Sequence, residues 1–185
     1  AYEIYQCDWS SDVCSSDLYG WTGLHNMSVD WDDAVMLEGL ANHGEAPIRV
    51  YNALVPEAAE QLFKSGPRSA GNGRIITRTL KFYMDGALGS RGAALLQPYA
   101  DSPGSSGLLQ MQKEKVLPVW ETALKKGVQV TTHAIGDRGN RMTLDWYAEA
   151  FKAVPEKERN IAKPRWRVEH AQIVNPADIP RFAAL

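Results

Sequence analysis

The sequence has few cysteines, no long apolar run and no excess of charge. Its 185 residues include two cysteines, Cys7 and Cys14, and no uninterrupted apolar stretch approaches the roughly 20 residues that a membrane-spanning helix needs. The 20 Lys and Arg nearly balance the 22 Asp and Glu, which argues against nucleic acid or a membrane as a partner, because both select basic surfaces. The chain also lacks Gly-x-Gly-x-x-Gly and Walker loops, which removes the commonest nucleotide-binding folds. With 44% hydrophobic residues, it can still form a packed core.

Residues 7–18 (CDWSSDVCSSDL) differ in composition from the rest of the chain. They are rich in Ser and Asp and show neither helical nor strand periodicity. A redox or metal pair at Cys7 and Cys14 is one interpretation, but the spacing matches no common zinc pattern and no histidine lies nearby. The tract resembles translated sequencing-adapter sequence. We therefore expect residues 1–18 to be a non-native tail and residues 19–185 to form the domain.

From Tyr19 onward, strand-like and helix-like segments alternate. The expected strands are residues 21–27, 48–55, 78–84, 128–133 and 165–172. The expected helices are residues 29–44 with Val35, Leu37 and Leu40 in the core, 56–66, 113–127, 137–154, and a last one from Asn175. Pro118 should kink its helix or mark the true start. Five strand–helix units in a row predict a parallel sheet with helical crossovers.

Either a doubly wound open sheet or a (β/α)8 barrel fits this alternation. Alternate side chains on a strand face opposite sides, so residues 80–85 would have an apolar face (Leu80, Phe82, Met84) and a polar one (Lys81, Tyr83, Asp85). A strand in an open parallel sheet is normally apolar on both faces, so the polar face favours a barrel interior. A closed barrel takes roughly 250 residues, and we therefore expect an incomplete (β/α)8 TIM barrel of the α/β class.

His133 and His170 end two successive predicted strands, at the edge where α/β barrels place their active sites. One strand histidine alone is more often an interior residue. Two at equivalent positions, with Lys81 facing inward on the preceding strand, indicate shared chemistry. Neutral imidazole is a common zinc ligand. Burial lowers the pKa of a lysine, and its free amine can add carbon dioxide to give a carbamate, an anionic ligand able to bridge two cations.

Other polar residues are expected to have more ordinary roles. His43, in the sequence ANHG, should be a solvated helix cap, whereas the orientation of His25 toward the barrel mouth stays open. Asp137 should cap the helix that it begins. Glu169 shares strand parity with Arg167, opposite to His170, which predicts a structural ion pair behind the barrel.

The loop of residues 85–110 is long for a connection between a strand and a helix, and such loops are often functional. Arg91 lies in the middle of this loop. It could bind a substrate carbonyl or carboxylate, or it could hold the loop together by hydrogen bonds. The two interpretations carry equal weight at this point.

Three segments, KFYMDGALGSRGAAL, VTTHAIGDRGNR and RWRVEHAQIVNPADIPRFAAL, resemble the amidohydrolase superfamily, in the amidohydrolase-3 branch that contains N-substituted formamide deformylase-like enzymes. The likeness covers about residues 19–185. It implies a barrel with one or two divalent metal ions, usually zinc. Lys81 would be the carboxylated bridging lysine, and His133 and His170 would be metal ligands. It also implies that metal-activated water hydrolyses an amide, formamide or related C–N bond, other than a peptide bond, in a small-molecule substrate.

The sequence departs from the family pattern at both ends. The family carries a His-x-His pair on its first strand and, on its eighth, an Asp that binds metal and acts as general base, and neither is found here. We therefore expect strands two to six of the barrel, no catalytic general base within the chain, and no activity from the chain alone. Homo-oligomerisation of the full-length protein stays open, and a cytoplasmic location is the default. The competing hypothesis is a non-catalytic α/β binding module in which Lys81, His133 and His170 are ordinary interior residues.

Deleting residues 1–18 should leave the melting temperature unchanged or raise it, because a tail without an apolar face adds nothing to the core. Thermal unfolding of the two chain lengths, followed by circular dichroism, checks this expectation. A large loss of melting temperature on deletion would show that the segment is native.

Overall fold

The computed structural model describes residues 20–185, so the expectations for residues 1–18, with Cys7 and Cys14, lie outside the described part. The strands are β1 (Gly23–Val29), β2 (Arg49–Leu54), β3 (Arg68–Ala70), β4 (Ile75–Tyr83), β5 (Gln129–Ala134) and β6 (Arg167–His170). They form one sheet in the order β1-β2-β4-β5-β6, all parallel, with β3 antiparallel to β4 beside this path. The predicted α/β class with a parallel half-barrel sheet is confirmed, and it is consistent with an incomplete (β/α)8 barrel.

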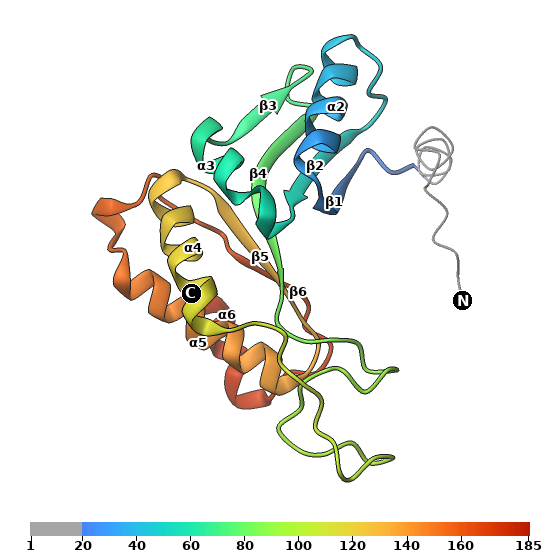
Figure 1. The fold of residues 1–185 in the computed structure, drawn as a ribbon, viewed down its shortest axis with the longest axis vertical. Helices are drawn as coiled ribbons and strands as arrows, with labels where there is room; N and C mark the ends of the chain where they lie inside the picture. The colour runs from blue at the N-terminus through green and yellow to red at the C-terminus, as the bar shows by residue number, and fades with distance from the viewer. Residues whose placement is uncertain (1–19) are drawn as a thin grey trace.

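Helices follow the parallel strands and pack along the sheet (Figure 1). The α-helices are α2 (Trp31–Asn42), α3 (Ala59–Ser65), α4 (Lys113–Lys126), α5 (Asp137–Ala153) and α6 (Ile179–Ala184). Short 3-10 turns are η1 (Pro56–Ala58), η2 (Glu156–Glu158) and η3 (Pro176–Asp178). Figure 1 shows α2 and α3 beside the upper strands, whereas α4 and α5 lie along β5 and β6. No helix of residues 20–185 is long and apolar enough to cross a membrane.

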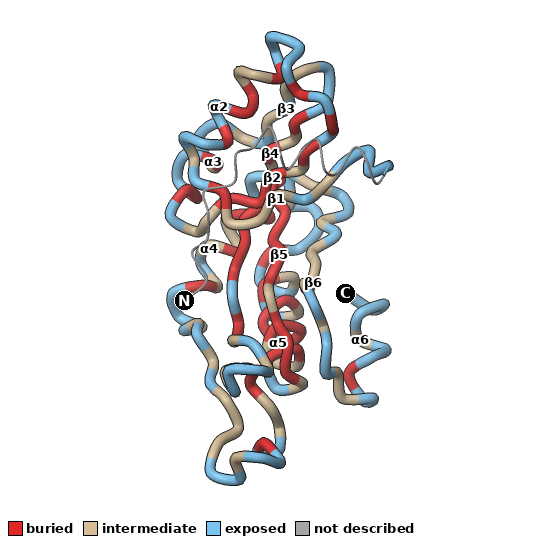
Figure 2. Tube along the Cα trace, turned by 90° about the vertical axis from the view of Figure 1, so that its right-hand side faces the viewer, coloured by how far each residue is buried: buried red, intermediate tan, exposed pale blue. Residues whose placement is uncertain are grey.

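The main core lies between the sheet and helices α4 and α5. Leu80, Phe82 and Met84 are buried on this side, as the alternation of residues 80–85 predicts. Trp120 of α4 is fully buried there, with its ring centroid 5.6 Å from that of Phe82 and 4.9 Å from that of Tyr147. Figure 2 shows β5 and the facing side of α5 as largely buried. This apolar side of the sheet leaves the opposite, concave side for polar residues.

Two helix expectations need correction. Val35 is 41% exposed, because the buried positions of α2 are Ala34, Leu37, Glu38 and Ala41, a spacing that puts residue 35 on the other side of the helix. Pro118 is not the start of its helix, since α4 begins at Lys113 and carries Pro118 inside it. Tertiary packing through Trp120 outweighs the backbone hydrogen bond that a proline removes.

The three-residue strand β3 is absent from the sequence expectations. Its Arg68 forms an ion pair with the buried carboxylate of Glu38 on α2, with Arg68 Nε 2.8 Å from Glu38 Oε2. The guanidinium also lies 5.2 Å from the centroid of the Trp31 ring. A strand this short has too few residues to show an alternating pattern. Its place is decided by the partner that Arg68 finds on α2.

Replacing Trp120 with Ala should lower the free energy of unfolding by about 3–5 kcal/mol, because it removes a large side chain from a closed aromatic cluster. Urea unfolding measures the change. Trp21→Ala is the matched control, since Trp21 is 60% exposed and its loss should change little. Equal effects of the two substitutions would contradict this account of the core.

Candidate metal centre

Lys81, Tyr83, His133 and Glu169 lie on the concave side of the sheet. In the parallel register, Lys81 is next to Thr131, Tyr83 is next to His133, and His133 is next to Glu169. Neighbours in such a register point to the same side, and residues two apart on a strand share that side. Lys81 and His133 therefore face the same side near the carboxyl ends of β4 and β5. This is the edge of an α/β barrel where chemistry is placed.

His170 reaches His133 because of an unusual backbone turn at the end of β6. It pairs in register with Ala134, so strand parity alone would direct it away from His133. However, His170 and Ala171 have φ values of 76° and 44°, in the left-handed region that residues other than glycine rarely adopt. The turn brings the two imidazole centroids to 4.6 Å. Strained backbone of this kind is concentrated at functional sites.

Lys81 is buried without a carboxylate partner. Its side chain is 3% exposed, and it forms no ion pair with any of residues 20–185. Nζ lies 3.7 Å from the centroid of the Tyr83 ring and 3.4 Å from the carbonyl oxygen of Phe82. Burial lowers the pKa of Lys81 to about 8, although the negative charge of Glu169 acts in the opposite direction. A substantial fraction of the amine is therefore uncharged at mildly alkaline pH.

The surroundings of His133 favour its neutral form. Burial lowers the pKa of its imidazole, and the electrostatic effects of the neighbouring His170 and Lys81 side chains lower it further, against opposing effects of the Gly86 backbone and of Asp85. Its Nε2 atom is buried and has no hydrogen-bond partner among the described residues. A neutral imidazole is the form that binds metal ions.

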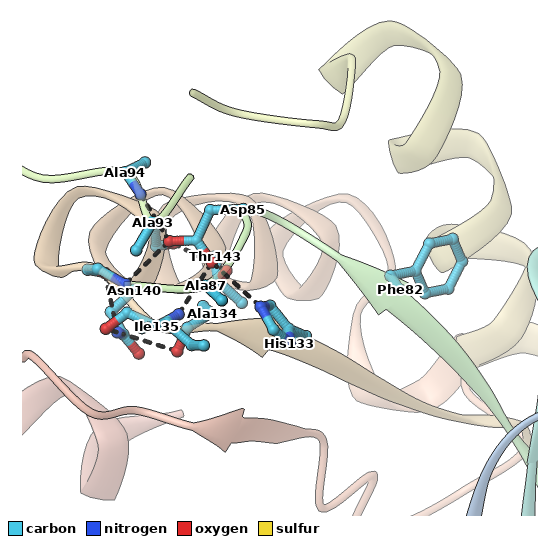
Figure 3. A network of polar contacts seen from close by, with 12 residues as sticks. Phe82, Asp85, Ala87, Ala93, Ala94, His133, Ala134, Ile135, Asn140 and Thr143 are labelled. Atoms are coloured by element: carbon cyan, nitrogen blue, oxygen red, sulfur yellow. Dashed lines mark hydrogen bonds and ion pairs between the residues drawn. The ribbon is translucent and has the colours of Figure 1, made fainter. Parts of the chain in front are cut away.

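Asp85 is the residue that the sequence reasoning did not single out. It follows β4 directly, is fully buried, and accepts backbone N–H groups from Ala94 (2.9 Å), Ile135 (2.9 Å) and Gly136 (2.8 Å). Figure 3 shows the carboxylate between the Ala93–Ala94 segment and His133. The available signal in the sequence was that Asp85 shares the polar face of residues 80–85 with Lys81. Two of its three bonding partners, Ile135 and Gly136, follow a different strand and could not be inferred from the local pattern.

Arg167 and Glu169 form the predicted ion pair, with Arg167 Nη2 2.9 Å from Glu169 Oε1. The pair is not behind the barrel, as expected, but on the concave side, where Glu169 also accepts a hydrogen bond from Thr131. Arg167 Nη1 lies 2.9 Å from His25 Nδ1. Because β1 and β6 are the two ends of the strand order, this contact spans the concave face. His25 therefore faces inward.

Three other expectations concern residues around the centre. His43 is exposed and forms the C-cap of α2, as predicted. Asp137 accepts N–H groups from Arg138 (3.0 Å) in its own helix and from Leu96 (2.8 Å) in the long loop. The N-cap of α5 is Gly136, so the expected cap at Asp137 is wrong, and this carboxylate anchors the loop instead. Arg91 lies in that loop and pairs with Asp101 at 3.0 Å between Nη2 and Oδ2. This is the contact expected for locking the loop, and substrate binding by Arg91 stays a prediction.

The residues at the carboxyl edge fit a divalent cation in part. Within residues 20–185, no three His, Cys, Asp or Glu side chains are grouped to hold a metal ion, so the amine of Lys81 is needed as a third donor. Two imidazoles in ring contact and an amine of lowered pKa form a nitrogen donor set of the kind that suits zinc. A hollow of about 840 Å³ lies at the opposite ends of the strands, next to Gln129 and Arg167, and is not this centre.

Comparison with known proteins gives one consistent result. Residues 15–185 match the family described as "Amidohydrolase family". The chain is 40% identical over 106 residues to Protein LONG AFTER FAR-RED 3 of Arabidopsis thaliana, covering 57% of the chain and 17% of that protein. It is 31% identical over 175 residues to Putative amidohydrolase YtcJ of Bacillus subtilis, covering 90% of the chain and 30% of that protein.

The solved structures agree. An uncharacterized metal-dependent hydrolase from Pyrococcus furiosus matches with a TM-score of 0.80 and 30% identity, covering 94% of the chain and 35% of that protein. One from Pyrococcus horikoshii has a TM-score of 0.76 and 28% identity, covering 92% and 33%. The chain thus spans about a third or less of the length of these proteins.

The Lys81 ammonium should lose its proton near pH 8 in the metal-free protein, because burial lowers its pKa from 10.5 to about 8. A ¹³C NMR titration of labelled lysine measures the midpoint, and Lys81→Met identifies the signal. Between pH 8 and pH 10.5, the Lys81 amine is largely protonated in the unfolded chain and largely uncharged in the folded chain. The unfolded chain therefore binds more protons, and the free energy of unfolding should increase as the pH rises through this range. A midpoint at or above 10.5 would show that the side chain is solvated.

Proposed function

The chain belongs to the amidohydrolase family, and from this premise we propose that it supplies part of the active site of a metal-dependent hydrolase acting on C–N bonds. The proposed substrates are small molecules with an amide, formamide or related bond other than a peptide bond. One observation supports the proposal: the rings of His133 and His170 are 4.6 Å apart at the carboxyl edge of the sheet, and Lys81 faces the same side as His133 on the neighbouring strand. In the competing non-catalytic module, these three residues would have no reason to share this edge.

Lys81, His133 and His170 would hold the cation, for which we propose zinc, as one or two ions. When bound, such an ion acidifies water to a pKa of roughly 7 and polarises a carbonyl. The uncharged amine of Lys81 can add to carbon dioxide. A bond forms between Nζ and carbon, the nitrogen loses one proton, and the carbamate carries one negative charge. This change would replace a cation that is costly to bury with an anionic oxygen ligand.

Tyr83 covers the centre from the concave side. Its ring packs against Lys81 Nζ and lies 5.2 Å from the His133 ring, and its hydroxyl is 2.5 Å from the Ser28 hydroxyl at the end of β1. The tyrosine therefore limits water access to Lys81. A side chain that is itself 41% exposed at this edge is also placed to contact a substrate.

We assign no general base to the carboxylates around the centre. Asp85 accepts three backbone N–H groups, Glu169 is bonded to Thr131 and Arg167, and Asp137 anchors the long loop. Each carboxylate is fixed in position by these partners. A proton carrier needs a carboxylate that is free to approach the attacking water.

The metal part of the proposal predicts that the chain binds zinc and loses affinity when a ligand is removed. Because loss of an outer-shell partner typically costs roughly 10–100-fold in metal affinity, His133→Ala and His170→Ala should each cost at least about tenfold. Isothermal titration calorimetry measures the affinity. His43→Ala is the control, since His43 is an exposed helix cap. Equal affinity in all four proteins would rule out the centre.

The C–N part is tested separately, in a protein of family length that contains this sequence. Hydrolysis of N-formyl and N-acyl amines should occur, peptide bonds should be left intact, and His133→Ala should remove the activity. If the protein binds zinc at His133 but cleaves only esters, the metal centre stands and the proposed bond class is wrong.

A further inference from the structure

The buried carboxylate of Asp85 approaches the imidazole of His133 (Figure 3). Asp85 Oδ1 lies 3.6 Å from His133 Nε2, and this ring nitrogen has no hydrogen-bond partner in residues 20–185. Buried polar atoms are nearly always paired, and leaving one unpaired costs free energy. The approach of these two atoms therefore calls for a functional explanation.

The acceptor capacity of Asp85 shows which of its atoms is available. An ionised carboxylate has about four lone-pair sites and no donor. Oδ2 accepts from Ala94 and Gly136, whereas Oδ1 accepts only from Ile135. The remaining site is on Oδ1, the oxygen that faces His133. Because the carboxylate can only accept, its partner on the imidazole must be an N–H group.

We propose that Asp85 is a positioning residue that holds His133 in the tautomer with its proton on Nε2, which leaves the lone pair of Nδ1 free for a cation. The inference rests on the proposed function, in which His133 is a metal ligand. Histidine ligands commonly donate their other ring N–H to a carboxylate, which fixes both the tautomer and the ring orientation. A movement of a few tenths of an ångström brings the two atoms into hydrogen-bond range.

Asp85 is suited to this task because it is itself immobilised. Its three backbone donors come from two segments, the long loop and the turn between β5 and α5. The space around it is also closed, since a Cβ atom at Gly139 would lie 2.4 Å from Asp85 Oδ2. A carboxylate fixed on this many sides can set the orientation of the neighbouring imidazole ring.

The tautomer is measured on the wild-type chain without metal. Long-range ¹H–¹⁵N NMR of histidine-labelled protein, in the presence of a chelator, distinguishes the protonated ring nitrogen from the bare one. We expect His133 to carry its proton on Nε2, and His133→Ala identifies the signal. A proton on Nδ1 would overturn the inference, whatever the variants show.

Asp85→Asn tests the positioning role. The amide oxygen can keep the Ala94 and Gly136 bonds, but its NH₂ group would then face His133 and favour the opposite tautomer. The zinc affinity should fall by about 10–100-fold, together with a shift of the proton to Nδ1. Circular dichroism establishes that the variant is folded. If it is not folded, a proton on Nδ1 in the wild-type chain would still overturn the inference.

Asp137→Asn is the matched control, because Asp137 anchors the same loop through Leu96 and is not bonded to His133. It should keep the wild-type tautomer and zinc affinity. If both variants lose affinity equally with no change of tautomer, Asp85 acts only on the loop and the inference is wrong. If the wild-type chain binds no zinc, the proposed function fails, while the tautomer result still stands by itself.

Discussion

The arrangement of the carboxyl edge of this sheet depends on the hydrogen bonds that the Asp85 carboxylate accepts. The carboxylate sits where β4 ends and bonds to one residue of the long loop and two of the turn that follows β5. The long loop and the turn after β5 are thereby joined to the end of β4 at a single buried side chain. Charge-assisted bonds to backbone N–H groups are stronger than neutral ones, and they satisfy donors that would otherwise be buried unpaired. The loop and the histidine strand are therefore positioned by one group.

The same turn is tied to the end of β6 by Asn140, which is fully buried at the start of α5. Its amide donates to the carbonyl oxygens of Gly136 (2.9 Å) and Ile173 (3.1 Å). Asn140 thus holds Ile173, which lies just after the left-handed residues His170 and Ala171. This explains how a conformation that costs of order 1–3 kcal/mol can persist. The rings of His133 and His170 meet because both strand ends are fastened to the start of one helix.

Curvature of the sheet decides the rest of the concave face. Arg167 on β6 reaches His25 on β1, with its guanidinium 5.7 Å from the centroid of the Tyr51 ring on β2. These contacts join the first and last strands across the polar side. Arg167 also pairs with Glu169, whose charge acts on Lys81. The electrostatic environment of the candidate centre is therefore a property of the curved sheet as a whole.

Local patterns predicted the five parallel strands and the α/β class that the structure has. Alternation in residues 80–85 placed Lys81 opposite the core, and the strand ends located His133 and His170 at one edge of the sheet. The same reasoning put Glu169 behind the sheet, because it used parity relative to His170 and could not anticipate the left-handed turn that redirects that residue. It assigned no strand to residues 68–70, which are too few for a periodic signal.

The sequence by itself determined which residues alternate between the two faces of the sheet, because burial on one side selects apolar side chains at every second position. It therefore determined the α/β class and the inward position of Lys81. Only the tertiary structure decided what those residues contact. The bonds of Asp85, the span of Arg167 and the meeting of His133 with His170 all join segments far apart in the chain. Such contacts depend on curvature and backbone turns that no local pattern encodes.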